Sequence, residues 1–316
     1  MNAPHLPTKT ASGSEAMALE AALAAVNSVL LGKTQPVKLA MACLIARGHL
    51  LLEDLPGMGK TLLAHALAKT LGLSFNRIQF TNDLLPGDLT GASIFDRERN
   101  AFSFHPGPIF TQFLLADEIN RASPKAQSAL LEAMEERQVS SDGISRALPR
   151  PFFVIATQNP VDQLSTNPLP EAQLDRFLMR LSLGYPDAGA EMAILRGEDR
   201  RSLLEQLPAT LDTDGLLALQ ETASKVHASE ALLAYIRALA EHTRYGADLP
   251  YGLSPRGALA LLAAGRAWAL LEGRDHVLPS DIQILFPHVA MHRLGLGDAR
   301  TAEAAATCIL EAVPLP

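Results

Sequence analysis

Residues 49–62 read HLLLEDLPGMGKTL, and this stretch decides the fold. A short apolar run at 49–53 is typical of a buried strand, and a helical pattern follows from Leu62 to Leu71. Between them lie glycines that let backbone amides close around phosphate oxygens, a lysine that neutralises phosphates, and a hydroxyl that can hold Mg²⁺. The following helix would direct its positive end at the same phosphates. The predicted phosphate-binding residues are Pro56, Gly57, Met58, Gly59, Lys60, Thr61 and Leu62.

One position departs from the strict form of this loop. The strict pattern has glycine at position 54, where this chain has Asp54. The match is therefore less specific than a full one, and a glycine-rich turn with an exposed lysine is the plain structural alternative. Support has to come from other motifs.

Two carboxylates, Asp117 and Glu118, directly follow a second apolar run at 110–116. In a parallel sheet buried on both faces, they would emerge at the carboxyl end of a strand, where catalytic loops belong. We expect Asp117 to hold Mg²⁺, as Thr61 would, and Glu118 to orient and polarise the water that attacks the γ phosphate. The sequence therefore predicts a nucleotide-hydrolysing site.

A third apolar run, at 152–156, ends in Thr157-Gln158-Asn159-Pro160. If this strand neighbours the second one, Asn159 can position the same water, although asparagine before proline is also common in turns. An arginine can stabilise the charge on the γ phosphate, either from a neighbouring subunit or from a second domain of the same chain. Arg176 and Arg256 are the candidates, and the residues alone do not rank them.

The chain is predicted to have three parts. Residues 1–13 mix Pro, Thr, Ser and Gly and predict a flexible tail, residues 14–186 an α/β core, and residues 187–316 an all-helical domain. Helices are expected to start at Ser254-Pro255 and at Pro279. Two antiparallel hairpins are predicted at 92–105 and 138–148, where they interrupt the alternation of strands and helices in the core.

Taken in order, four segments resemble the MoxR family of AAA+ ATPases. They are GHLLLEDLPGMGKT from residue 48, LADEINR from 115, ATQNP from 156 and EAQLDRF from 171. The resemblance covers nearly the whole chain after the tail, and Asp54 is usual for the family. It implies an α/β fold: a P-loop NTPase core of the AAA+ kind with a parallel sheet flanked by helices, followed by a C-terminal all-helical lid domain.

The resemblance also implies roles for single residues. Asn159 would be the sensor 1 residue, Arg176 the arginine finger acting on a neighbour's ATP, and Arg256 the sensor 2 residue of the lid. The two hairpins would be the helix-2 insert and the hairpin before sensor 1, which face the central pore or the substrate. ATP and Mg²⁺ are the implied cofactors.

The family further implies a homo-oligomeric ring, usually a hexamer, with chaperone-like activity. Its members remodel or activate client proteins, often metal-dependent enzymes, commonly with a partner that carries a von Willebrand factor A domain. Three alternatives remain open at this point: an ATPase subunit like that of magnesium chelatase, an ATP-gated adaptor that performs little mechanical work, and a DNA-directed motor. Compact insert regions argue against the first and the acidic charge balance against the last.

The bulk composition limits the other classes. A net charge of −7 argues against nucleic acid as a partner, and no apolar run reaches the ~20 residues of a membrane helix, so no membrane insertion is expected. Cys43 and Cys308 lie far apart without a metal-binding frame, which fits reduced thiols and a cytoplasmic location. His288 and His292 are interpreted as ordinary helix histidines, because no third metal ligand is apparent.

Overall fold

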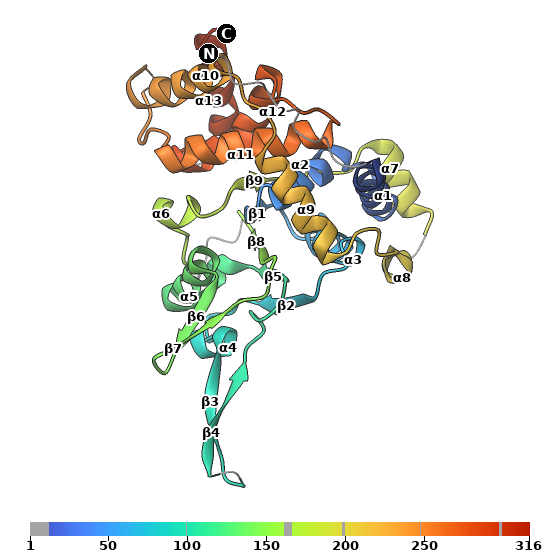
Figure 1. Ribbon diagram of the computed structural model, residues 1–316, viewed down its shortest axis with the longest axis vertical. Coiled ribbons are helices and arrows are strands. Elements are labelled where there is room, and N and C mark those ends of the chain that lie inside the picture. The colour runs from blue at the N-terminus through green and yellow to red at the C-terminus, as the bar shows by residue number, and fades with distance from the viewer. Residues whose placement is uncertain (1–12, 99, 161–165, 198–199, 247, 297–298) are drawn as a thin grey trace, which may run out of the picture.

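The computed structural model describes residues 13–98, 100–160, 166–197, 200–246, 248–296 and 299–316. Its centre is a five-stranded parallel sheet flanked by helices, which confirms the predicted α/β fold (Figure 1). In spatial order the strands are β2 (Phe75–Gln79), β5 (Phe113–Asp117), β8 (Phe153–Gln158), β1 (Leu50–Glu53) and β9 (Met179–Leu181). The predicted tail lies outside the described residues except for Gly13.

The two faces of the sheet carry separate hydrophobic clusters, because successive side chains of a strand alternate between faces. Leu115 and Ile155 pack on one face with α1 (Gly13–Val29), α2 (Thr34–Ile45) and α3 (Lys60–Thr70). Leu114 and Val154 pack on the other face with α5 (Pro124–Glu136). Both central strands are therefore apolar along almost their whole length, which is the pattern of a sheet that is buried on both faces.

The polar residues gather where the strands end. In the register of the parallel pairs, Asp117 of β5 lies opposite Gln79 of β2, and Glu53 of β1 lies opposite Gln158 of β8. Since the carboxyl ends of parallel strands meet at one edge, this edge presents carboxylates, amides and the loop that precedes α3. The functional site is built there.

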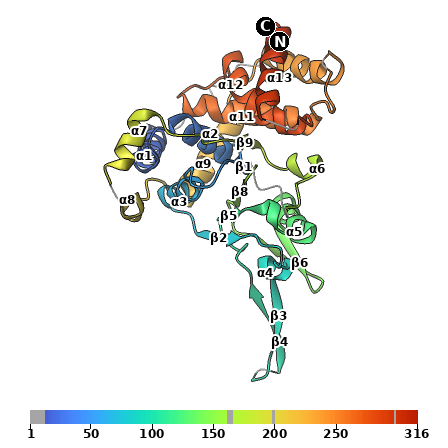
Figure 2. The same cartoon turned by 180° about the vertical axis from the view of Figure 1, so that it is seen from behind.

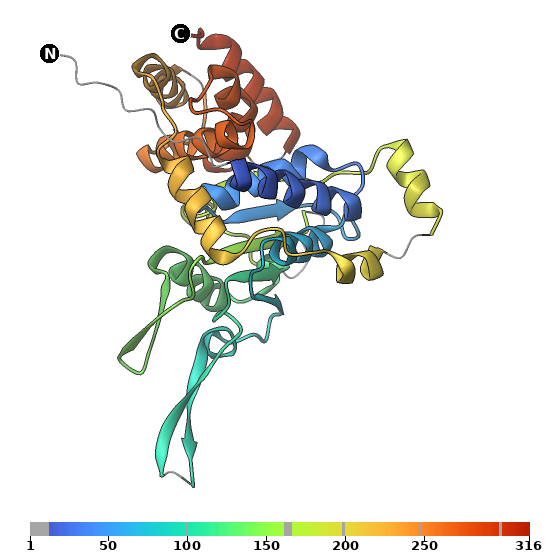
Figure 3. The ribbon, with the colours of Figure 1, turned by 45° about the vertical axis from the view of Figure 1, so that its right-hand side comes forward.

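Two hairpins project from the sheet region, as predicted. The longer one consists of β3 (Gly91–Asp96) and β4 (Ala101–Pro106), and the shorter one of β6 (Gln138–Ser141) and β7 (Ile144–Ala147). Figure 3 shows both extending away from the helices at the other end of the molecule. The base of the longer hairpin needs glycine, because a Cβ on Gly91 would lie 2.3 Å from the His105 carbonyl oxygen.

Three shorter helices connect the strands of this core. They are α4 (Pro86–Thr90), the 3₁₀ turn η1 (Ile119–Arg121) and α6 (Glu171–Leu174). The α4 segment leads directly into the longer hairpin, and α6 precedes β9, the strand at the edge of the sheet next to β1.

From residue 187 onward the described chain forms helices and no strand. These are α7 (Ala188–Leu195), α8 (Arg200–Gln206), α9 (Thr213–Ser224), α10 (Glu230–Glu241), η2 (His242–Gly246), α11 (Pro255–Leu271), α12 (Pro279–Ala290), η3 (Met291–Arg293) and α13 (Ala299–Ala312). The predicted start of α11 is confirmed: Ser254 is its N-cap, and its Oγ accepts a hydrogen bond from the Gly257 amide at 3.0 Å. The start of α12 at Pro279 is confirmed too.

The helices of this region lie in two places. Helices α10 to α13 gather at one end of the molecule, whereas α7 and α8 lie beside α1 and α3 (Figures 1 and 2). Buried residues of α9, α11 and α12 continue the hydrophobic cluster of α2, so the core is shared across the proposed boundary at residue 187. Among the described residues, no helix combines the length and apolar character needed to cross a membrane.

Candidate nucleotide-binding site

The loop between β1 and α3 is shaped by two glycines. Gly57 has φ 85° and Gly59, the N-cap of α3, has φ 95°, a conformation that costs residues with a side chain free energy. Because α3 starts at Lys60, its unpaired backbone amides lie at the end of this loop. The geometry is that of an anion-binding helix terminus.

A cavity of about 870 Å³ lies against this loop. Such a volume is in the range of small-molecule and cofactor sites. Predicted residues on its wall are Pro56, Gly57, Gly59, Lys60, Thr61, Leu62, Asp117, Glu118 and Asn159. Met58 is absent from the wall, because its side chain packs against the hydrophobic core. The Thr61 hydroxyl and the Asp117 carboxylate share one cavity, and oxygen donors of this kind fit Mg²⁺.

Asp117 is held by two side chains from neighbouring strands. Its Oδ1 accepts a hydrogen bond from the Thr157 Oγ1 at 2.6 Å, and its Oδ2 accepts from Arg77 Nη2 at 2.7 Å and Nε at 3.2 Å. Thr157 is completely buried, and Asp117 is only 8% exposed. The carboxylate is thus fixed in orientation at the edge of the cavity.

Glu118 has an unusual backbone conformation. Its φ is 55°, in the left-handed region that residues with a Cβ rarely adopt, and its amide donates to the Thr157 Oγ1 at 2.9 Å. Its Oε2 accepts from the Gln79 Nε2 at 2.7 Å and lies 3.2 Å from Arg121 Nη1. Strained residues held by their surroundings concentrate at functional sites. The side chain of Glu118 is directed toward β2.

Lys60 folds back onto its own loop. Its Nζ donates to the carbonyl oxygens of Asp54 at 2.5 Å and Leu55 at 3.0 Å. Burial lowers the pKa of Lys60, and the nearby charges of Asp54, Asp117 and Glu118 oppose this shift. The ammonium group therefore lies between the loop and the acidic strand end. From this position it could neutralise the charge of a phosphate bound in the cavity.

Asp54 is a structural part of the loop. Its carboxylate accepts hydrogen bonds from the Ser182 Oγ at 2.8 Å, the Gly184 amide at 3.2 Å and the Leu183 amide. These donors follow β9, so the residue that departs from the strict loop pattern ties the phosphate loop to the chain leaving the sheet. A glycine could make none of these contacts.

Neither of the two candidate arginines, Arg176 and Arg256, lines the nucleotide cavity. Arg256, at the start of α11, pairs with Glu135 and lies 3.7 Å from the Asp175 Oδ2. Asp175 immediately precedes Arg176, whose side chain forms no ion pair with another described residue. Arg256 thus contacts the residue next to Arg176 in the sequence, and neither arginine is among the residues that line the Lys60 cavity.

The segment around Arg176 is anchored to the C-terminal helices. The buried Arg293 donates from Nε to the Asp175 Oδ1 at 2.7 Å and from Nη2 to the Phe177 carbonyl at 2.7 Å. His292 Nε2 donates to the same carbonyl at 3.0 Å, and burial keeps the pKa of His292 well below its ordinary value. Within the described chain, no group of three His, Cys, Asp or Glu side chains forms a metal site, and His292 is a structural histidine.

Sequence reasoning missed several residues of the site. Arg77, Gln79 and Thr157 hold the acidic pair, and α8 covers part of the cavity through Arg200, Leu204 and Glu205. Arg77 and Gln79 alternate with Ile78 on β2, and this alternation was the available signal. The contacts of α8 depend on tertiary packing and left no local signal.

Comparison with known proteins agrees with this geometry. Residues 49–179 match the family described as ATPase family associated with various cellular activities (AAA), and residues 241–311 match the AAA lid domain. Fold and site thus define an AAA-type ATPase core with a helical lid.

Full-length relatives define the family more narrowly. Chaperone MoxR1 of Mycobacterium tuberculosis is 39% identical, over 96% of this chain and 83% of that protein. Protein MoxR of Paracoccus denitrificans is 35% identical, over 87% of this chain and 88% of that protein. A crystal structure from Cytophaga hutchinsonii superposes with a TM-score of 0.87 at 37% identity, over 96% of both chains. The chain belongs to the MoxR family of AAA+ ATPases.

Proposed function

We propose that this protein hydrolyses ATP at the interfaces of a ring and uses the energy to remodel or activate client proteins. The observation that carries the proposal is that neither Arg176 nor Arg256 lines the cavity of its own chain, while Arg256 contacts Asp175, the residue that precedes Arg176. A phosphate in the cavity would have Lys60 on one side but neither of these arginines. We propose that a neighbouring subunit supplies them.

The residues of the cavity divide the work of hydrolysis. Lys60 and the backbone amides of Gly57 and Gly59 bind the phosphates, and Thr61 and Asp117 hold Mg²⁺, which neutralises charge on the phosphates when bound. Glu118 acts as the base that orients and polarises the attacking water. Asn159 helps to position that water.

Both arginines act on the nucleotide of the next subunit. Arg176 is the arginine finger and Arg256 the sensor 2 residue, and each supplies a fixed positive charge against the γ phosphate. A head-to-tail contact of this kind closes into a ring, and we propose six subunits from the family membership. Residues 187–316 act as the helical lid.

The hairpins are the proposed client contacts. At the longer hairpin, Ile94 is 55% exposed and Phe102 74% exposed, and Phe102 meets Phe95 edge to face. At the shorter one, Ile144 is 56% exposed. Projecting hairpins with apolar side chains suit contact with partly unfolded chain segments. We propose in addition a partner with a von Willebrand factor A domain and a cytoplasmic location, on family membership alone.

Two variants test the ATPase proposal. Lys60→Ala should abolish nucleotide binding, because the loop loses its phosphate-neutralising charge. Glu118→Gln should keep ATP binding but lose hydrolysis, because an amide cannot polarise water, and it should hold the protein in its ATP-bound assembly. Hydrolysis by Glu118→Gln at the unsubstituted rate would contradict the role of Glu118.

The Glu118→Gln protein also tests the client proposal. Proteins captured with it should be identified by mass spectrometry and compared with those captured by a Glu118→Gln protein that carries Phe102→Ser. We expect the hairpin substitution to reduce client capture while ATP binding is unchanged. When a captured client is added to the unsubstituted protein, we expect the conformation of the client to change only while ATP is hydrolysed. A client that binds without such a change would favour an ATP-gated adaptor.

A further inference from the structure

A second cavity, of about 180 Å³, lies at the edge of the sheet opposite the nucleotide cavity. Phe153, at the amino end of β8, lines it, whereas Gln158, at the carboxyl end of the same strand, lines the nucleotide cavity. Five steps along a strand span about 17 Å. The two cavities are therefore separate places in the fold.

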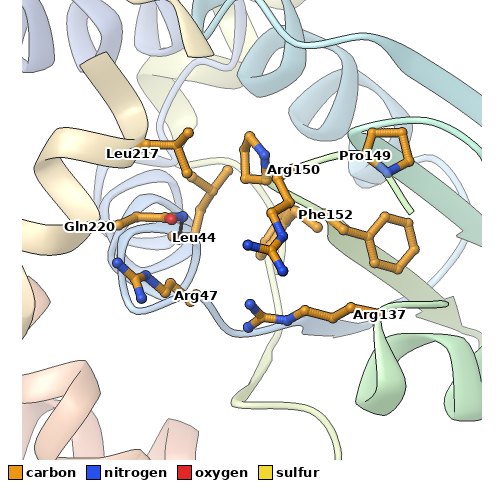
Figure 4. Close-up of a pocket in the computed structure, with 10 residues that line it drawn as sticks. Leu44, Arg47, Arg137, Pro149, Arg150, Phe152, Leu217 and Gln220 are labelled. Atoms are coloured by element: carbon orange, nitrogen blue, oxygen red, sulfur yellow. Dashed lines mark hydrogen bonds between the residues drawn. The ribbon is translucent and has the colours of Figure 1, made fainter. Parts of the chain in front are cut away.

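The wall of this cavity carries three arginines and no carboxylate. It consists of Leu44, Arg47, Arg137, Pro149, Arg150, Pro151, Phe152, Phe153, Leu217 and Gln220. In Figure 4 the side chains of Arg137 and Arg150 extend from different segments toward the same part of the cavity. The apolar residues of the wall lie around these cations.

The positive charge is incompletely neutralised. Arg47 Nη2 lies 3.3 Å from Glu221 Oε2, and Glu221 is shared with Lys225 at 2.9 Å. Arg137 and Arg150 pair with no carboxylate in the described parts of the chain. Neighbouring guanidinium groups repel each other, and a bound anion would relieve this repulsion. The concentration of positive charge is notable in a chain whose net charge is −7.

The backbone fixes the places from which the arginines extend. Arg137 caps the C-terminus of α5 with φ 52°, and its carbonyl accepts from the Leu148 amide at 3.0 Å. The Arg150 carbonyl accepts from the Gln112 side chain at 3.0 Å, and Arg47 has φ 60°. Arg47 and Arg137 each lie at the C-terminus of a helix, where a left-handed residue is common. Both side chains therefore extend from fixed helix ends.

We propose that this cavity binds an oxyanion, a carboxylate or a phosphate, that is attached to a small apolar group. Planar guanidinium groups suit both oxyanions because they can donate two parallel hydrogen bonds. Arg137 and Arg150 are the principal binding residues, and Arg47 adds charge. Phe152, Leu44 and Leu217 contact the apolar part. The oxyanion can come from a small phosphorylated or carboxylated molecule or from an acidic residue of a polypeptide.

Calorimetric titration of the full chain tests this proposal and separates the two sources. Every protein should carry Lys60→Ala, which removes phosphate binding at the nucleotide loop. The probes are phenyl phosphate, which joins an oxyanion to a small apolar group, and, separately, a short peptide of Asp, Glu and Phe with blocked ends. Saturation by phenyl phosphate indicates a small-molecule ligand and saturation by the peptide a polypeptide ligand; either supports the site.

Two charge-matched double variants decide whether binding belongs to the cavity. Arg137→Gln/Arg150→Gln should weaken binding by about tenfold or more, because charge-assisted hydrogen bonds are lost. Lys125→Gln/Arg237→Gln removes the same charge from exposed positions elsewhere and should leave the affinity within about twofold. Failure of both probes to saturate, or equal weakening by the two double variants, would overturn the proposal. Both arginines are exposed, so thermal unfolding should confirm that the variants fold.

Discussion

The Asp175 carboxylate accepts a hydrogen bond from Arg293 Nε at 2.7 Å, and this contact joins the segment that carries Arg176 to the C-terminal helices. Arg293 is buried, whereas Asp175 is also reached by the more exposed Arg256. The same carboxylate therefore contacts an arginine of α11 and an arginine of η3, and it belongs to the residue that precedes Arg176.

Asp175→Ala should therefore destabilise the fold strongly. It leaves the guanidinium of Arg293 buried without a carboxylate, which costs about 3 kcal/mol or more in the free energy of unfolding. Glu135→Gln is the matched control, because it breaks only the partly exposed pair with Arg256 and should cost less than about 1 kcal/mol. Urea denaturation measures both. Similar decreases in the free energy of unfolding for the two substitutions would show that the Asp175 contact stabilises the fold no more than an exposed ion pair does.

Asp54→Gly should harm the protein although it restores the strict loop pattern. The substitution removes the acceptor of the Ser182, Leu183 and Gly184 hydrogen bonds, and unsatisfied buried donors cost about 2 kcal/mol or more in unfolding free energy. Binding of a fluorescent ATP analogue should weaken as the loop loses its anchor. Asp54→Asn keeps one acceptor oxygen, so its stability and its affinity for the analogue should lie between those of the unsubstituted and the Asp54→Gly proteins. A more stable or tighter-binding Asp54→Gly protein would contradict this role.

Thr157→Val should lower hydrolysis by about tenfold or more while ATP binding changes little, because the hydroxyl orients both Asp117 and the backbone of Glu118. Valine matches threonine in shape, so the effect isolates the two hydrogen bonds. The control is Thr157→Ser, which keeps the hydroxyl and should retain most of the activity. The measurements are the steady-state rate of ATP hydrolysis and the affinity for nucleotide. A Thr157→Val protein with the unsubstituted rate would contradict the proposal that this hydroxyl positions Asp117 and Glu118.

Stability should fall on mild acidification because of His49. This buried histidine accepts from the Val154 amide through Nδ1 at 3.0 Å, and burial lowers its pKa to about 4. Between pH 6.5 and 4 the unfolded chain takes up a proton that folded His49 does not. This difference removes about 3 kcal/mol of stability as the pH falls through that window and is constant below it.

The test is the slope of unfolding free energy against pH between 4 and 6.5. His49→Gln should reduce this slope, and His292, whose pKa is also lowered by burial, should account for part of what remains. Equal slopes in the His49→Gln and unsubstituted proteins would show that His49 does not titrate as described.

The parts that were predictable from sequence are those encoded locally. The phosphate loop, the ends of β5 and β8, both hairpins and the starts of α11 and α12 rest on short patterns of glycine, proline and apolar residues. β2 escaped prediction because three of its five residues are polar, and β9 because it has only three residues. An edge strand with one partner does not need a continuous apolar run.

The contacts within the site depend on the order of strands, which no local pattern specifies. Arg77 reaches Asp117 because β2 lies beside β5, and Thr157 does so because β8 lies on the other side. Similarly, family resemblance suggested roles for Arg176 and Arg256, but their common neighbour Asp175 emerged only from the packing of α11 and η3 against that segment. The candidate site residues could thus be recognised from the sequence, but the contacts between them could not.

The most direct test of the central claim, that a neighbouring subunit completes each ATP site, is to mix two inactive variants. Arg176→Ala retains the cavity residues, and Glu118→Gln retains the arginine. In an equal mixture about one quarter of head-to-tail interfaces would combine the intact halves. We predict that hydrolysis, negligible for each variant alone, recovers to about this fraction of the unsubstituted rate. If the mixture stays as inactive as its components, or if Arg176→Ala alone hydrolyses ATP normally, the claim is contradicted.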